Sequence, residues 1–78
     1  MKLSDAIIQR INYYLKLNNM KPYDLYKKTG ISRSTISTFM NTPNSLPKID
    51  TILHVCEGFN ITLGEFFSDP IFDEAEQD

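Results

Sequence analysis

Polar side chains that can form hydrogen bonds recur between residues 33 and 38, on Arg33, Ser34, Ser37 and Thr38. Their spacing places them on one side of a helix, with Ile36 and Phe39 turned toward the other side. The strip carries a guanidinium and hydroxyl groups but no carboxylate. Such a face can enter the major groove of DNA without repelling phosphates. The alternative is that it is an ordinary solvated helix face.

Neither a catalytic nor a metal-binding set of residues accompanies this strip. The single histidine, His54, has no second histidine, cysteine or paired carboxylate at ligand spacing, so we expect it on the surface. The serines at positions 32, 34 and 37 have no histidine in their segment to act as a base. A glycine-rich phosphate loop is also missing. We expect no enzymatic activity, no cofactor and no metal.

The polar strip needs a helix to carry it and a turn to present it, and residues 25–39 supply both. Gly30 lies where a helix end favours a residue that tolerates positive φ, and two lysines precede it, where cations complement the helix dipole. Ser32 can cap a new helix with its hydroxyl. We predict helices over residues 22–29 and 33–41, which together form a helix-turn-helix.

Helices are also expected on either side of this pair. Apolar residues at helical spacing predict a first helix over about residues 5–18, with Ser4 as its N-cap. Residues 42–47 contain two prolines, an asparagine and a serine, and form a loop. The apolar pattern that follows predicts a fourth helix over about residues 48–57, closed by Gly58.

The C-terminal part of the sequence predicts one more helix and a tail. Thr62 and Glu65 fit a capping box that opens a short fifth helix. Residues 70–78 are acidic, and we expect them to be flexible. The sequence therefore predicts an all-α fold, a compact five-helix bundle over residues 1–69 with a flexible tail.

Length and composition limit the chain to one small domain. Its 78 residues can fold alone but are too few for a deep catalytic cleft. The single cysteine, Cys56, has no disulfide partner, which suits a protein of the reducing cytoplasm. We expect Cys56 to be buried in the core. No apolar segment has the length of a membrane span or the pattern of an export signal. We expect a cytoplasmic protein without membrane contact.

Charge divides the sequence into two halves. The net charge is −2, but residues 1–48 hold all eight Lys and Arg and only two of the ten acids. That half has a charge of +6, and residues 49–78 have a charge of −8. The predicted helix-turn-helix lies in the basic half, so one face can attract phosphate. The alternative is that the charges only keep the surface soluble.

These motifs together resemble the phage-repressor and Cro-like helix-turn-helix family, the xenobiotic-response-element type of transcriptional regulator. The resemblance rests on residues 25–37, on Pro47 and Thr51 at the entry to the fourth helix, and on residues 58–67. It implies a lambda-repressor-like fold that presents helix 33–41 to the major groove. The base contacts that it implies are on Arg33, Ser34, Ser37 and Thr38, with the Arg33 fork matched to guanine. The phosphate contacts that it implies are on Lys21, Ser32, Asn41, Asn44, Ser45 and Lys48.

Some residues depart from the family pattern. Pro22 stands where the family usually has a phosphate-binding glutamine, and it offers neither a side-chain donor nor an N–H. Tyr26 stands where an alanine is usual, which predicts a wider approach of the two helices or a ring that tilts outward. Met40 replaces a position that is frequently acidic. We expect the four tyrosines to be packing residues.

Two functions from different classes follow. The resemblance implies sequence-specific binding of double-stranded DNA by a small standalone regulator, a repressor that acts as a homodimer on a palindromic operator. The second hypothesis is a protein-interaction module, such as an antitoxin or anti-repressor, whose partner is another protein. It rests on the acidic second half, which carries more apolar surface than a small core buries, on Phe59, Ile61, Phe66, Phe67, Ile71 and Phe72.

Overall fold

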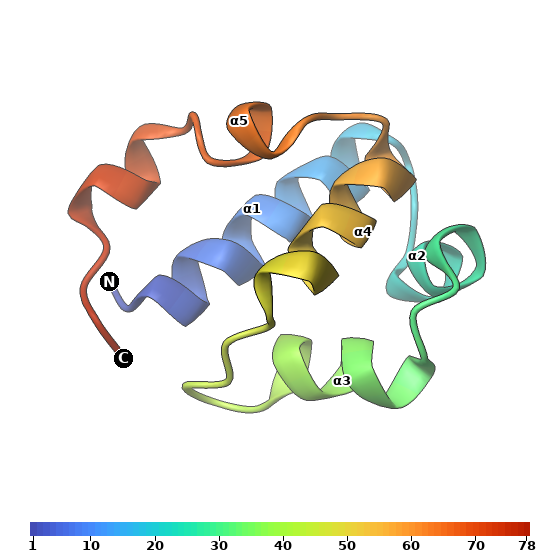
Figure 1. The fold of residues 1–78 in the computed structure, drawn as a ribbon, viewed down its shortest axis with the longest axis horizontal. Coiled ribbons are helices and arrows are strands. Elements are labelled where there is room, and N and C mark those ends of the chain that lie inside the picture. The colour runs from blue at the N-terminus through green and yellow to red at the C-terminus, as the bar shows by residue number, and fades with distance from the viewer.

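The computed structural model describes residues 1–78 and consists of helices joined by short loops (Figure 1). The elements are α1 Leu3–Leu17, α2 Pro22–Thr29, α3 Arg33–Asn41, α4 Ile49–Phe59, α5 Leu63–Phe66 and the 3₁₀ helix η1 Pro70–Glu74. The molecule measures 31 × 23 × 21 Å. No helix in it is long and apolar enough to cross a membrane. The predicted all-α fold is confirmed.

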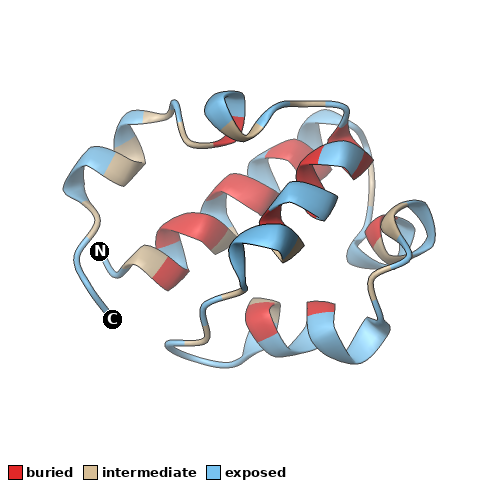
Figure 2. Cartoon of the chain, viewed as in Figure 1, coloured by how far each residue is buried: buried red, intermediate tan, exposed pale blue.

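One apolar core holds the helices together. Its centre is formed by Leu25 of α2, Cys56 of α4 and Phe66 of α5, none of which has measurable exposure. Figure 2 shows the buried residues along the inward sides of α1 and α4. The remaining members of the core are Ile7, Ile11, Tyr14, Leu15, Ile36, Phe39, Ile52, Val55 and Phe59. Because α2 and α3 contribute to this core, their relative position is fixed by the body of the protein.

The helix-turn-helix forms where the sequence predicts it. Gly30 has φ 74° and donates its N–H to the carbonyl of Tyr26 at 3.0 Å, which ends α2 in a left-handed cap. The Ser32 hydroxyl accepts a hydrogen bond from the N–H of Thr35 at 3.2 Å and opens α3. Both helices have the predicted bounds.

The start of α1 differs from the prediction, because Ser4 is not the N-cap. The helix begins at Leu3, and Ser4 is buried in its first turn. The N–H of Leu3 donates to the carbonyl of Glu76 at 2.9 Å, and that of Ser4 donates to the carboxylate of Asp78 at 2.9 Å. The free amides of the helix start are therefore satisfied by the far end of the chain, where a carboxylate also complements the helix dipole.

The C-terminal segment, which the sequence predicts as a flexible tail, contains a short helix and contacts the rest of the fold. Pro70–Glu74 forms η1, whose first turn is capped by the Asp69 carboxylate accepting from the N–H of Ile71 at 2.9 Å. Phe72 packs against Phe66 and Phe67, with ring centroids 5.9 and 4.9 Å apart. Two aromatic contacts and the hydrogen bonds to the start of α1 hold a segment whose composition alone suggested disorder. The two chain ends consequently lie close together (Figure 1).

Gly58 does not close α4 as predicted. The helix continues to Phe59, and Asn60 with φ 59° takes the left-handed cap position. A Cβ atom on Gly58 would lie 2.6 Å from the Cγ2 methyl of Thr29 in α2. The glycine is therefore required by the close approach of α4 to the end of α2 and not by a turn.

Arg10 belongs to the basic half of the sequence but does not contribute its charge to an open face. It is buried, and its guanidinium donates to the carbonyls of Glu65 and Phe66 at 2.7 Å each and to the Tyr14 hydroxyl at 3.0 Å. The Asp69 carboxylate lies 3.5 Å from it. Arg10 thus ties α1 to the end of α5.

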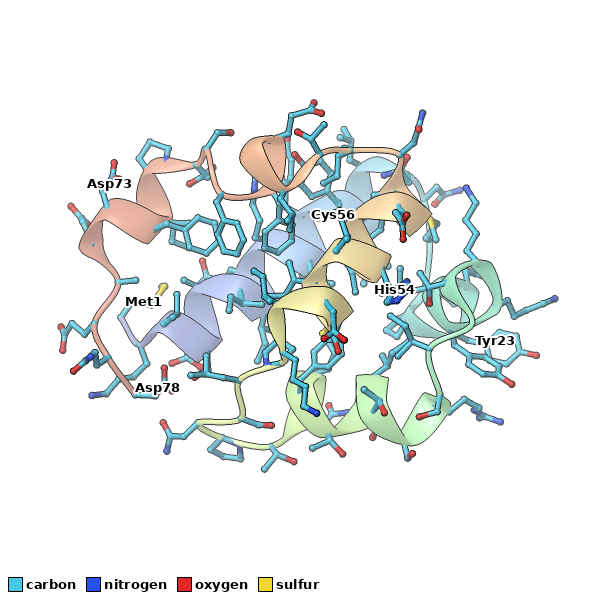
Figure 3. All side chains as sticks on the ribbon, in the orientation of Figure 1. Met1, Tyr23, His54, Cys56, Asp73 and Asp78 are labelled. Atoms are coloured by element: carbon cyan, nitrogen blue, oxygen red, sulfur yellow. The ribbon has the colours of Figure 1, made fainter.

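Three smaller predictions agree with the structure. Thr62 and Glu65 form the predicted capping box at the start of α5. Cys56 is buried, and burial raises the pKa of its thiol to about 11. His54 lies on the surface of α4, where its Nδ1 is 3.3 Å from the Glu57 carboxylate (Figure 3).

Candidate nucleic-acid interface

The polar strip lies along the exposed side of α3. Arg33, Ser34, Ser37 and Thr38 are all exposed, whereas Ile36 and Phe39 point into the core. α3 packs on α2 and α1 through this buried side, and Figure 1 shows it along one edge of the molecule. No acidic residue occurs within the helix. The outer surface of α3 is thus a polar ridge.

Hydrogen bonds within the ridge decide which groups remain available. Thr38 donates its hydroxyl proton to the carbonyl of Ser34 at 2.7 Å, so its oxygen faces outward as an acceptor. The amide of Asn41 donates to the carbonyl of Ser37 at 3.0 Å, which leaves the Asn41 oxygen free. Ser32 is already occupied as the cap and also donates to the Thr35 hydroxyl at 2.8 Å.

Arg33 keeps its hydrogen-bond donors for an external acceptor. The three ion pairs of the structure involve other residues. Its guanidinium carbon lies 5.5 Å from the ring centroid of Tyr23 and 6.0 Å from that of Tyr26, both on α2. These distances are within the range of cation–π attraction. The side chain is thus held at the start of α3 by rings that do not use its N–H groups.

A hollow of about 450 Å³ borders α3 on the side of the loop that leads to α4. It brings four predicted contact residues together, Ser34 and Thr38 from α3 with Ser45 and Lys48 from the loop. The carboxylate of Asp50 lines the same hollow, and its Oδ1 accepts from the N–H of Thr51 at 2.8 Å. Asp50 was not expected near the predicted contacts, because it belongs to the acidic half of the sequence, which begins at residue 49.

A second hollow, of about 470 Å³, borders α3 on the side of α2. Arg33, Ser37 and Asn41 line it from α3, and Tyr23 and Tyr26 line it from α2. Tyr26 is half-buried with its ring toward this hollow, so the large residue in place of alanine stands where α2 and α3 meet.

Three of the predicted phosphate contacts, Lys21, Ser32 and Asn44, line neither hollow. Lys21 is exposed immediately before α2, where its backbone N–H donates to the Asp24 carboxylate at 2.8 Å. Asn44 is exposed in the loop after α3 and has φ 60°.

Positive and negative charges are concentrated at opposite ends of the long axis of the molecule. The acidic C-terminal segment and η1 lie at one end and α2 with its lysines at the other (Figure 1). Lys2 is taken up at the acidic end, where its Nζ donates to the carbonyl of Gln77 at 3.1 Å. The free cations are therefore concentrated toward the helix-turn-helix, as anion binding at that end requires.

Tyr23 is a neighbour of Arg33 that the sequence pattern did not indicate. It was expected to pack, but 53% of it is exposed, and Figure 3 shows it projecting from α2 on the outside of the molecule. Its ring contacts Arg33 and also Lys27, whose Nζ is 5.7 Å from the centroid. The available signal was its place in the first turn of α2, which a helix-turn-helix brings near the first turn of α3.

Comparison with known proteins agrees with this geometry. The chain is similar to the crystal structure of the prophage Lp1 protein 11, with 22% identity, a TM-score of 0.83 and coverage of 96% of this chain and all of the other. At this identity the likeness establishes the fold. No curated protein matches the sequence significantly. The model of the Cro/C1-type HTH DNA-binding domain matches residues 10–70. The chain therefore belongs to the Cro/C1-type family of helix-turn-helix DNA-binding domains.

Proposed function

We propose that the protein is a sequence-specific transcriptional repressor that binds a palindromic operator in double-stranded DNA as a homodimer. α3 enters the major groove, where Arg33, Ser34, Ser37 and Thr38 contact bases. The phosphate backbone is held by Lys21, Asn41, Asn44, Ser45 and Lys48, and by Ser32 when its hydroxyl proton turns from Thr35 to a phosphate oxygen.

The observation that carries this proposal is the chemistry of the exposed side of α3. It is free of carboxylates and begins with an arginine that has no carboxylate partner. The fork of Arg33 fits the two acceptors of guanine, and the outward acceptor of Thr38 suits an amino group of adenine or cytosine.

The hollows on either side of α3 suit the two DNA strands that border a major groove. Ser45 and Lys48 provide a hydroxyl and a cation in one hollow. Asn41 provides its partly used amide nitrogen as a donor in the other. Groups of this kind fix the register of a protein on DNA without selecting sequence.

Dimerisation and repression are the finer parts of the proposal. Two copies related by a twofold axis present two α3 helices to successive major grooves of a palindrome. Exposed apolar side chains on the loop after α3 and on α4, namely Leu46, Ile49 and Leu53, supply surface for such contact. Occupancy of an operator that overlaps a promoter is sufficient for repression. Sedimentation with and without operator duplex tests the dimer.

The second hypothesis, a protein-interaction module, loses its main support. Of the six residues on which it rests, Phe59 and Phe66 are buried in the core, and Ile61, Phe67, Ile71 and Phe72 are half-buried. Phe66, Phe67 and Phe72 pack on one another with centroid separations of 4.9 to 5.9 Å. The aromatic surface on which the hypothesis rested is mostly used inside the protein.

A salt titration of binding to duplex DNA tests the proposal. The logarithm of the affinity should fall linearly with the logarithm of salt concentration, by about 0.9 for each phosphate neutralised. Lys48→Ala should reduce that slope by about 1 for each protomer and weaken binding to all sequences alike. Lys16→Ala, which removes an exposed cation from the last turn of α1, serves as the matched control and should leave the slope unchanged. Undetectable binding at low salt would overturn the proposal.

A further inference from the structure

We propose that Tyr23 is a positioning residue for DNA recognition, because its ring holds the Arg33 guanidinium in place for base contact. The inference rests on the proposed function and concerns a residue outside the predicted contact set. Tyr23 lies in the first turn of α2 and Arg33 opens α3, ten positions later. The turn at Gly30 brings the two within cation–π distance, at 5.5 Å.

Exposure of the ring is the first argument for this role. More than half of Tyr23 is open to solvent, although burial of an aromatic residue is a large source of stability. Leu25 of the same helix is completely buried and attaches α2 to the core without help from Tyr23. A residue kept exposed beside Arg33 contributes little to the core and has its main contacts on the outer surface.

The contacts of the ring are the second argument. Tyr23 is approached by Arg33 at 5.5 Å and Lys27 at 5.7 Å, and its ring centroid is 5.9 Å from that of Tyr26. Tyr26 is half-buried and therefore fixed, with its own ring 6.0 Å from the guanidinium. The two tyrosines form a tilted pair that Arg33 overlies.

Contact with the Tyr23 ring pre-organises the Arg33 side chain for recognition of a base. A free arginine side chain loses rotamer entropy when it is immobilised. A π surface restrains the guanidinium without occupying any of its N–H groups, whereas a carboxylate partner would compete with the guanine acceptors. The ring therefore lowers the loss of freedom on binding and leaves the recognition fork intact.

The first test needs no DNA. Ring currents should shift the Arg33 Hδ and Hε resonances upfield in the NMR spectrum of the free protein. Tyr23→Leu, which keeps an apolar side chain but removes the π system, should abolish most of the shift, and Tyr23→Phe should keep it. Because Tyr23 is exposed, both variants should have the thermal stability of the parent within a few degrees. Unshifted Arg33 resonances in the parent protein would overturn the proposal, whatever the protein binds.

The second test uses duplexes selected from a randomised pool by the parent protein. Tyr23→Leu should reduce discrimination at one base pair about two- to fivefold, the range of an exposed cation–π contact, and Tyr23→Phe should restore it. In an Arg33→Ala background, Tyr23→Leu should have no further effect on discrimination. An equal loss from Phe and Leu, or the same loss in both backgrounds, would overturn positioning. Absence of any selected sequence would instead contradict the proposed function, and the NMR result would then decide on Tyr23.

Discussion

Gly58→Ala is expected to destabilise the protein although it places a better helix former inside α4. Alanine in a helix interior is favoured over glycine by about 1 kcal/mol. At this position the new Cβ would lie 2.6 Å from the Thr29 methyl and 3.4 Å from the Leu25 Cδ1. The first distance is about 1 Å shorter than ordinary contact between carbon atoms.

Thr29 cannot turn away without losing hydrogen bonds. Its hydroxyl donates to the carbonyl of Leu25 at 2.8 Å and accepts from the N–H of Ile31 at 3.2 Å. Rotation of the side chain would break both bonds, at about 1 kcal/mol each. Movement of α2 would instead disturb its packing on α4, with a typical cost of about 1–3 kcal/mol. After the gain of about 1 kcal/mol in helix propensity, a net loss of about 1 kcal/mol remains.

A double-mutant cycle isolates this contact. Thr29→Ser removes the methyl and keeps the hydroxyl, so Gly58→Ala should become neutral or stabilising in that background. The coupling free energy should be about 2 kcal/mol, measured by urea unfolding of the four proteins by circular dichroism. If Gly58→Ala has the same effect in both backgrounds, the close approach of α4 to α2 does not explain the glycine.

Three further predictions concern the contacts that hold the body of the protein. Arg10→Met should lower the free energy of unfolding by about 3 kcal/mol, because it leaves the carbonyls at the end of α5 without donors; a loss below 1 kcal/mol in urea unfolding would contradict this role. Cys56 should resist iodoacetamide in the folded protein, and rapid alkylation under native conditions would refute burial of the thiol. Because the folded state holds the thiol proton more tightly, the contribution of Cys56 to stability should be complete below its ordinary pKa of 9.0 and should decline as pH rises toward about 11. Hydrogen bonds from Ser4 hold the pKa of Asp78 below its usual value of 3.8, so Asp78→Asn should weaken the protein at neutral pH. That difference should disappear as pH falls through the lowered pKa, and a pH-independent difference would exclude the carboxylate as its cause.

The helix-turn-helix was predictable because its signals are local. Gly30 and Ser32 act through hydrogen bonds to residues within four positions of them, at the end of α2 and the start of α3. The capping box of Thr62 and Glu65 is equally local. Each of these residues specifies backbone geometry by its own chemistry, so the sequence pattern was sufficient.

The missed features depend on residues distant in sequence. Ser4 looked like a cap, but the amides it would have served are bonded to Glu76 and Asp78. Gly58 looked like a stop, but its role depends on Thr29 in another helix. Arg10 counted as surface charge until the carbonyls at the end of α5 were placed beside it. None of these partners can be inferred from local spacing.

The candidate interface divides in the same way. The α3 residues share a face because helical periodicity requires it. The neighbours of that face, Tyr23 and Asp50, come from other segments and became visible only in the hollows beside α3.

The central claim, that the exposed side of α3 binds DNA bases, is tested most directly by one binding measurement. The parent protein, the Arg33→Ala/Ser34→Ala/Thr38→Ala variant and the Lys16→Ala control are titrated with a duplex selected from a randomised pool and with a scrambled duplex. The account predicts that the triple variant loses its preference for the selected duplex and keeps weak, salt-dependent binding to both, with its unfolding transition intact. The control should behave like the parent. Equal preference in the triple variant and the parent would contradict the account.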